Sequence, residues 1–223
     1  MKAVVFDLGG TLMEYLGMPH NWSDYYRQGF ERVNSNFSLN LTDEIIETSI
    51  EILKSYNARI NYREIEYAPE YIFGEVMRDW NADISAADAI SAFFEGMELR
   101  AEIYEDTIPC LTRLEEKEIK IAALTDLPTA MPDEMFKKDI DSLLGNLDLY
   151  VSSLSCGYRK PNKFGLAFIA ERFGMKIEDL LFVGDEEKDR LTAQNAACAF
   201  LKIDRARTSD GAIQSLYELE QML

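Results

Sequence analysis

The segment "VVFDLGGTLM", from Val4 to Met13, decides how the rest of the chain is interpreted. It is an apolar run that ends in an aspartate, Asp7, and continues into two glycines and a threonine. These residues are compatible with two phosphate chemistries. In one, the glycines form a loop that cradles the phosphates of a nucleotide. In the other, Asp7 is a nucleophile at the end of a buried strand.

Short apolar runs recur along the chain and predict the strands of a parallel sheet. Lys2 to Phe6 is rich in valine, which is typical of a strand buried on both faces. Four later runs predict further buried strands, at residues 119–126, 147–153, 180–185 and 199–204. Helical patterns separate some of them, and strands that alternate with helices predict a doubly wound, mostly parallel α/β sheet.

The long stretch after the first strand has a helical texture instead. Thr42, followed by acidic residues, is typical of a helix N-cap. Pro69 favours the start of a second helix, and Ser85 followed by Asp88 favours the start of a third. We therefore interpret the stretch from about residue 14 to residue 103 as a helical insertion into the α/β fold.

Composition excludes several classes of partner. The formal net charge of -17 over 223 residues argues against a nucleic-acid groove or an anionic membrane surface, because both require a clustered basic face. The three cysteines are far apart and form no C-x-x-C pair, so we expect reduced thiols. No apolar stretch approaches the roughly 18 residues that a membrane span needs. We expect a cytoplasmic protein.

Four polar motifs follow the predicted strands, at the carboxyl ends where open parallel sheets bind ligands. Each has a structural explanation by itself, such as a turn cap, a strand-end hydroxyl, a solvated lysine or the acidic start of a helix. Short motifs also arise often by chance. The motifs are Asp7 after "VVF", Thr125 and Asp126 after "IAAL", Lys160 in "GYRKPN", and Asp185 with Asp189 in "VGDEEKD".

Taken together, the motifs predict a phosphoryl-transfer site. The carboxylates of Asp7, Asp185 and Asp189 are hard oxygen ligands suited to Mg²⁺. A lysine and a hydroxyl beside them supply the cation and the donor that a transferring phosphoryl group requires. Asp7 could then attack phosphorus and form an aspartyl phosphate.

With these motifs in this order, the chain resembles the haloacid dehalogenase (HAD) superfamily of hydrolases. The match covers the whole length: "VFDLGGTL", a helical insert, "ALTD", "GYRKPN" and "VGDEEKD". The resemblance implies a Rossmann-like core, residues 1–13 and 104–223, with an α-helical cap at residues 14–103. It also implies Mg²⁺ as the cofactor and a small phosphorylated metabolite as the substrate.

The resemblance also assigns roles to single residues. Asp7 is implied to be the nucleophile, and Thr125 and Lys160 to hold the phosphoryl group, with Lys160 also orienting Asp7. The implied catalytic residues are Asp7, Thr125 and Lys160, the implied substrate-binding residues are Gly10, Thr125, Asp126 and Lys160, and the implied Mg²⁺ ligands are Asp7, Asp185, Asp189 and the backbone carbonyl of Gly9.

Two other readings of the opening segment explain less of the chain. A D-x-G-G-T loop of the actin-like sugar kinases is normally followed by the second strand of a hairpin, whereas "MEYLGMPHNWSDYYRQ" has a polar and helical texture. That reading also leaves "GYRKPN" and "VGDEEKD" unexplained. A phosphorelay receiver domain shares the Asp, Thr and Lys chemistry but has no large helical insert. The set favours the nucleophile.

Gly9 departs from the family pattern, because phosphatases of this family usually carry a second aspartate there as general acid and base. Three explanations remain open. His20, the only histidine, could replace the missing group. The substrate could have a good leaving group, as in an acyl phosphate or a nucleotide diphosphate. The protein could instead be a phosphometabolite-binding or regulatory protein with weak turnover. A dehalogenase also lacks this aspartate, but the acidic pair favours a metal.

Substrate choice is expected to reside in the insert, because in this family the core contacts only the phosphoryl group. Aromatic residues of the insert could line such a lid, although packing within the insert is the commoner role of such residues. The sequence identifies neither the substrate nor whether the protein is a monomer or a homodimer. The candidate lid residues are Trp22, Tyr25, Tyr26, Tyr62 and Phe73.

Overall fold

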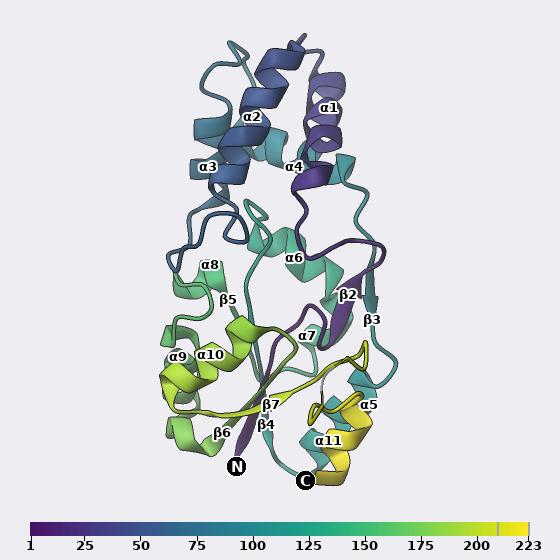
Figure 1. Cartoon of the computed structure of the whole chain (residues 1–223), viewed down its shortest axis with the longest axis vertical. Helices are drawn as coiled ribbons and strands as arrows, with labels where there is room; N and C mark the ends of the chain where they lie inside the picture. The colour runs from purple at the N-terminus through teal and green to yellow at the C-terminus, as the bar shows by residue number, and fades with distance from the viewer. Residues whose placement is uncertain (209, 223) are drawn as a thin grey trace.

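A five-stranded, wholly parallel sheet forms the centre of the protein. The structure, a computed structural model, describes residues 1–208 and 210–222. The strand order is β5-β4-β1-β6-β7, and the predicted α/β fold is confirmed. Figure 1 shows the sheet in the lower half of the molecule. The strands are β1 (Ala3–Phe6), β4 (Lys120–Thr125), β5 (Leu149–Ser152), β6 (Leu180–Gly184) and β7 (Ala199–Lys202).

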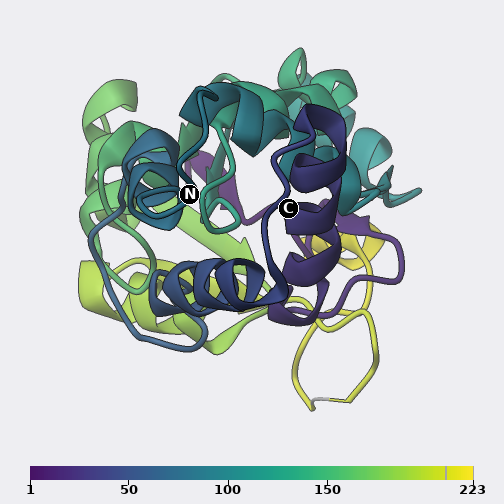
Figure 2. The ribbon, with the colours of Figure 1, turned by 90° about the horizontal axis from the view of Figure 1, so that it is seen from above.

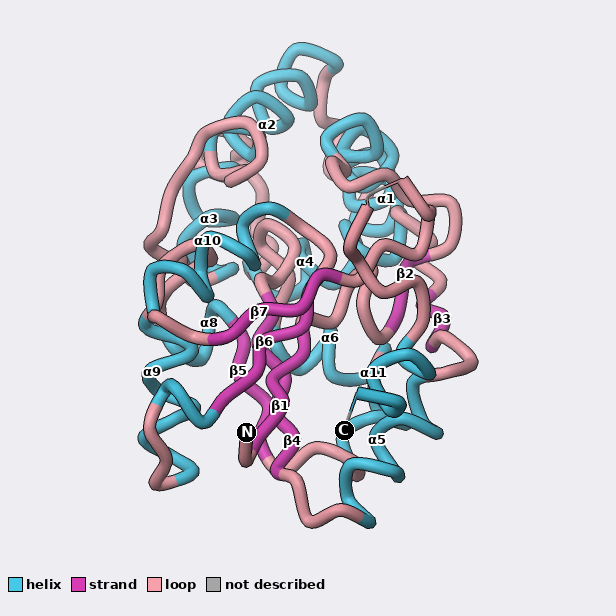
Figure 3. The backbone as a smooth tube through the Cα atoms, turned by 60° about the horizontal axis from the view of Figure 1, so that its bottom comes forward, coloured by secondary structure: helices cyan, strands magenta, loops and turns pink. Residues whose placement is uncertain are grey.

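Helices cover both faces of this sheet, as the tube in Figure 3 shows. Successive side chains of a strand point to opposite faces, so Val4 and Phe6 join one apolar cluster and Ala3 and Val5 join the other. All four are fully buried, which explains the continuous apolar run. The core helices are α5 (Thr107–Glu116), α6 (Asp133–Asp139), α7 (Asp141–Leu144), α8 (Ser153–Cys156), α9 (Phe164–Phe173), η2 (Ile177–Asp179), α10 (Glu187–Ala196) and α11 (Leu216–Met222).

The insertion after the first strand forms a separate group of helices above the carboxyl ends of the strands (Figure 1). The predicted helix starts are confirmed: the hydroxyls of Thr42 and Ser85 accept hydrogen bonds from the third residue beyond each, and Pro69 opens α3. These helices, with the segments that lead into them and join them, are called the cap below. They are η1 (Ser23–Tyr25), α1 (Tyr26–Phe37), α2 (Asp43–Ser55), α3 (Pro69–Val76) and α4 (Ala86–Gly96).

The cap has an aromatic core of its own. Phe30, Phe73 and Phe93 lie with ring centroids 4.8 to 6.3 Å apart. Trp80 stands edge-on to Phe30, and its indole N–H donates to the hydroxyl of Ser49 at 2.9 Å. Phe73 is therefore a packing residue of the cap rather than a lid residue. Figure 2 shows the backbone of the cap helices from above.

A small antiparallel ribbon joins the core to the cap. Strand β2 (Met13–Tyr15) pairs with β3 (Ala101–Ile103), so the two points at which the chain crosses between the core and the cap lie side by side. The sequence did not predict this ribbon, because a strand of three residues is too short to show an alternating pattern. The division at residues 13/14 and 103/104 stays a prediction, and both points fall at the ribbon.

A second contact between cap and core lies on the other side of the site. The segment between α2 and α3 runs down to the loop that follows α8, where Ile65 and Tyr158 form an isolated antiparallel bridge. The amide of Arg159 donates to the carbonyl of Glu64 at 2.8 Å, and the amide of Glu66 donates to the carbonyl of Gly157 at 3.0 Å.

None of the helices within the described residues combines the length and the apolar character that crossing a membrane requires.

Candidate active site

The predicted site residues come together at the carboxyl ends of three adjacent strands. Asp7 follows β1, Thr125 ends β4, and Asp185 follows β6. Because the sheet order places β1 between β4 and β6, Asp7 lies between the other two. These residues line a cavity of about 1140 Å³ that the cap residues Trp22 and Arg59 also line. The fold therefore places the predicted chemistry at the boundary between core and cap.

A buried ion pair forms the floor of this cavity. The ammonium of Lys160 lies 2.8 Å from a carboxylate oxygen of Asp7 and 2.5 Å from one of Asp189. The Lys160 side chain is 2% exposed. Burial by itself would lower the pKa of Lys160, but the charges of Asp189 and Asp7 outweigh it and raise that pKa. Lys160 is therefore held as a cation beside the predicted nucleophile.

The carboxylates outnumber this cation. Asp7, Asp185 and Asp189 each offer an oxygen within 4.8 Å of the others. Burial, and then the charge of Asp189, raises the pKa of Asp7 to about 7. Burial, and then the charge of Asp7, raises the pKa of Asp185 to about 8. One buried oxygen of Asp185 has no hydrogen-bond partner among the described residues. Crowded carboxylates that oppose one another's ionisation fit a divalent cation such as Mg²⁺, which would favour their charged forms.

Two glycines bring the backbone close to this acidic cluster. Gly10 has a φ of 76°, and a Cβ built on it would lie 2.3 Å from a carboxylate oxygen of Asp185. Both its conformation and the space around it therefore require glycine. Gly9 differs, since a Cβ there would meet no atom within 4 Å. Gly9 lines the cavity, so the position where the family pattern has an aspartate is open.

The side chain of Asp126 holds two loops together. One of its oxygens accepts a hydrogen bond from the Lys160 amide at 2.9 Å, and the other lies 3.2 Å from the ammonium of Lys188. Burial would raise the pKa of Asp126, but Lys188, Arg159 and Lys160 outweigh it and lower that pKa. An ionised carboxylate in this position does not attract an anion, so a contact with phosphate would have to come from the backbone of Asp126.

His20 and Arg59 bring the cap to the mouth of the cavity. The Nδ1 atom of His20 lies 3.0 Å from a carboxylate oxygen of Glu186, and Arg59 lies 2.7 Å from the same oxygen. The His20 side chain is 72% exposed. Burial would raise the pKa of Glu186, but Lys188 and Arg59 outweigh it and lower that pKa to about 2. Both cap residues thus meet an ionised carboxylate next to Asp185.

Among the described residues that line the cavity, seven are cationic and seven are acidic, although the whole chain has a net charge of -17. Only Lys160 among these cations was predicted from the sequence. Arg159 and Lys188 lie inside the motifs singled out there, whereas Arg59 and Arg63 come from a loop with no recognisable pattern. The cavity is therefore less negative than the chain as a whole, which favours an anionic ligand. The cationic lining residues are Arg59, Arg63, Arg159, Lys160, Lys188, Lys202 and Arg205.

The candidate lid aromatics divide into two groups. Trp22, Tyr26 and Tyr62 line the cavity. Tyr25 and Phe73 are not among the described residues that line it. Tyr26 does more than pack against its neighbours, because its hydroxyl accepts a hydrogen bond from the side-chain amide of Asn57 at 3.0 Å. The lid role therefore stays a prediction for Trp22, Tyr26 and Tyr62.

The parallel sheet in this strand order, the aspartate at the end of its central strand and the helical cap above it define the haloacid dehalogenase class of fold. The model of the haloacid dehalogenase-like hydrolase family matches residues 1–197. The chain therefore belongs to this family of hydrolases.

Several relatives are similar over nearly the whole chain. The phosphoglycolate phosphatase of Aliivibrio fischeri is 23% identical over 200 residues, which cover 89% of this chain and 82% of the relative. The glyceraldehyde 3-phosphate phosphatase of Methanopyrus kandleri is 25% identical over 218 residues, 94% of this chain and 87% of the relative. The crystal structure of a HAD phosphatase from Thermococcus onnurineus has a TM-score of 0.64 at 20% identity, covering 100% of this chain and 97% of that one.

The raised pKa of Asp185 makes stability depend on pH when no metal is bound. Its carboxyl keeps its proton up to about pH 8 in the folded chain, whereas its ordinary pKa is 3.8. Between these two pKa values the folded chain keeps a proton that the unfolded chain has lost. The free energy of unfolding of the metal-free protein therefore decreases as the pH rises through this range. We expect Asp185→Asn to raise the melting temperature at pH 8 by roughly 3 °C, and by less at pH 5.

Thermal denaturation in a chelating buffer at the two pH values measures this difference. Asp83→Asn serves as the matched control, because Asp83 is exposed in the segment between α3 and α4. That control should melt like the wild type at both pH values. An Asp185→Asn variant that is no more stable than the wild type at pH 8 contradicts the proposed crowding of carboxylates.

Proposed function

We propose that the protein is a Mg²⁺-dependent phosphatase that acts on a small phosphorylated metabolite through an aspartyl phosphate on Asp7. The observation that carries this proposal is the 2.8 Å contact between Lys160 and Asp7 at the floor of a cavity that cationic residues line. Membership in a family of hydrolases supports the reaction type. The names of two relatives, a phosphoglycolate phosphatase and a glyceraldehyde 3-phosphate phosphatase, support the substrate class.

Asp7 performs the first step as a nucleophile. A carboxylate oxygen of Asp7 attacks phosphorus, and the bond between phosphorus and the leaving oxygen breaks, which leaves an aspartyl phosphate. Lys160 remains beside Asp7 and balances negative charge as it accumulates on the phosphoryl oxygens. The hydroxyl of Thr125, buried at the end of β4, lines the same cavity and donates to one of these oxygens.

The acidic cluster is the proposed Mg²⁺ site. Asp7, Asp185, Asp189 and the carbonyl of Gly9 would hold the ion. Bound there, Mg²⁺ supplies positive charge that offsets the repulsion between the nucleophile and an anionic phosphate. Asp189 has a second role in this arrangement, because its other oxygen accepts a hydrogen bond from the Glu186 amide at 3.0 Å and thereby fixes the start of α10.

His20 is the residue that we propose as the replacement for the missing acid and base. It lines the cavity from the cap side, and with Nδ1 engaged by Glu186 its Nε2 atom is left to exchange a proton. A nitrogen of His20 and an oxygen of Asp185 lie within 4.8 Å of each other, which places the imidazole next to the acidic cluster. The proton goes to the leaving oxygen in the first step and is taken from water in the second.

Removal of the nucleophile tests the reaction itself. We expect Asp7→Asn to reduce Mg²⁺-dependent phosphate release from phosphomonoesters by about 10³-fold or more, because the amide cannot form the acyl phosphate. Phosphate release from a panel of phosphomonoesters and acyl phosphates, with and without Mg²⁺, measures it. Asp83→Asn is again the control. Absence of phosphate release from the wild type would favour the binding or regulatory alternative, and release of halide from a 2-haloacid assayed in parallel would favour a dehalogenase.

The open space at Gly9 allows the missing acid to be restored. We expect Gly9→Asp to raise kcat on an alkyl phosphate by about 10-fold or more, because a positioned general acid contributes on the order of 10² to 10⁴. Gly9→Asn is the matched control, since it has nearly the same size and no proton to donate. Equal rates for the two variants would show that the acid/base is not what limits turnover.

The role of His20 shows in the dependence on the leaving group. We expect His20→Gln to slow the formation of the aspartyl phosphate by about 10²-fold on an alkyl phosphate and by less than about 3-fold on p-nitrophenyl phosphate, whose leaving group needs no proton. Single-turnover kinetics with both substrates measure this first step. In the Gly9→Asp background the loss should largely disappear. A loss of the same size on both substrates in this step would remove His20 from the role of acid to the leaving oxygen.

A further inference from the structure

A segment of the cap lies against the loop that carries Lys160. Residues 64–66 pair with residues 157–159 through the backbone hydrogen bonds described above. The side-chain amide of Asn162 adds a further hydrogen bond to the carboxylate of Glu64 at 2.9 Å. Lys160 therefore belongs to a loop that has the core on one side and the cap on the other.

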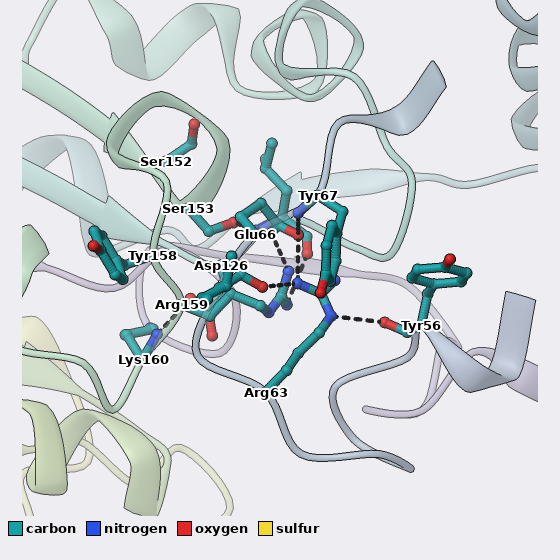
Figure 4. Close-up of polar contacts among 12 residues, drawn as sticks. Tyr56, Arg63, Glu66, Tyr67, Asp126, Ser152, Ser153, Tyr158, Arg159 and Lys160 are labelled. Atoms are coloured by element: carbon teal, nitrogen blue, oxygen red, sulfur yellow. Dashed lines mark hydrogen bonds and ion pairs between the residues drawn. The ribbon is translucent and has the colours of Figure 1, made fainter. Parts of the chain in front are cut away.

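One buried carboxylate lies at the centre of this contact. The Glu66 side chain is 6% exposed, and both its oxygens accept hydrogen bonds. One oxygen accepts from the hydroxyl of Ser153 at 2.6 Å and from Arg159. The other lies 2.8 Å from Arg63 and accepts from the Tyr67 amide at 3.0 Å. Figure 4 shows the guanidinium groups of Arg63 and Arg159 converging on Glu66.

Both core partners of Glu66 hold the same residue of the loop after β4. The Ser153 hydroxyl accepts a hydrogen bond from the Leu127 amide at 3.0 Å, and Arg159 donates to the Leu127 carbonyl at 3.0 Å. Both polar backbone groups of Leu127 are thus fixed by side chains that Glu66 orients. Leu127 lies two residues after Thr125, so this arrangement sets the course of the chain that leaves the phosphoryl-binding hydroxyl.

The same contact reaches Lys160. Arg159 immediately precedes Lys160, whose amide donates to Asp126 in the loop that Leu127 belongs to. Glu66 is also the only carboxylate that the described hydrogen bonds and ion pairs give to Arg159. The Nε atom of Arg159 and one Nη atom of Arg63 are buried without a hydrogen-bond partner among the described residues. Loss of Glu66 would remove the ion-pair partner of two largely buried arginines.

We propose that Glu66, a residue of the cap, is a positioning residue for the active site. Through Ser153 and Arg159 it holds the two loops that carry Thr125 and Lys160. The phosphoryl-binding groups are therefore aligned only when this cap segment lies against the core. The inference rests on the proposed function for its effect on catalysis. Its effect on the two loops does not depend on that function.

Replacement by the neutral isostere is the direct experiment. We expect Glu66→Gln to lower kcat by about 10- to 100-fold and to change KM by less than about 3-fold, because small displacements of positioning groups affect the transition state most. Glu75→Gln is the matched control: Glu75 forms an ion pair with Arg78 in the same cap, far in sequence from the two loops. It should keep the wild-type kcat. An unchanged kcat in Glu66→Gln overturns the proposal.

A double-variant cycle separates positioning from a general loss of stability. If Glu66 acts through Arg159, Glu66→Gln added to Arg159→Met should lower kcat by a much smaller factor than Glu66→Gln alone. Circular dichroism confirms that each variant is folded at the assay temperature. Effects on kcat that multiply fully would show that the two residues act independently, which overturns the assigned route.

Amide hydrogen exchange tests the loops without reference to catalysis. We expect exchange at residues 126–127 and 157–160 to be about 10-fold faster in Glu66→Gln, and unchanged in Glu75→Gln. If the wild type releases no phosphate under any condition, the proposed function fails and this exchange alone decides the positioning role. Unchanged exchange in Glu66→Gln overturns it, and so does faster exchange with an unchanged kcat in an active wild type.

Discussion

The contact of Lys160 with Asp7 and Asp189 is the interaction on which the site depends. All three side chains are almost fully buried, where an unpaired charge is costly. Lys160 keeps its charge because carboxylate oxygens of Asp7 and Asp189 lie within 3 Å of its ammonium and raise its pKa. With Asp185 close by, three carboxylates lie around this one lysine, an arrangement that fits a divalent cation.

The position of the cap follows from two attachments that differ in kind. The β2–β3 ribbon carries the covalent connections, whereas the segment around Glu66 is held by a buried carboxylate between two arginines. A ribbon alone would leave the cap free to tilt about its two crossing points. The second attachment gives the loop that carries Lys160, and the neighbouring cap residue Arg59, a defined position relative to the floor of the cavity.

Much of the fold was predictable because its signals are local. Each of the five apolar runs contains one of the observed parallel strands, and the caps at Thr42 and Ser85 lie where their side chains indicated. These predictions succeeded because a buried strand and an N-cap can each be recognised from a few consecutive residues. The ribbon strands of three residues carry no such periodicity, and the polar texture after Met13 was taken for helix alone.

By itself the sequence determined the class of fold and which polar residues come together, because the motifs follow strands whose carboxyl ends must meet at one edge of a parallel sheet. Only the tertiary structure decided what surrounds them. Glu66 lies 93 residues from Arg159 along the chain, and His20 is separated from Glu186 by most of its length. Such pairs leave no spacing pattern in the sequence, since their contact arises from how the cap packs on the core. The open space at Gly9 is likewise a property of the folded site.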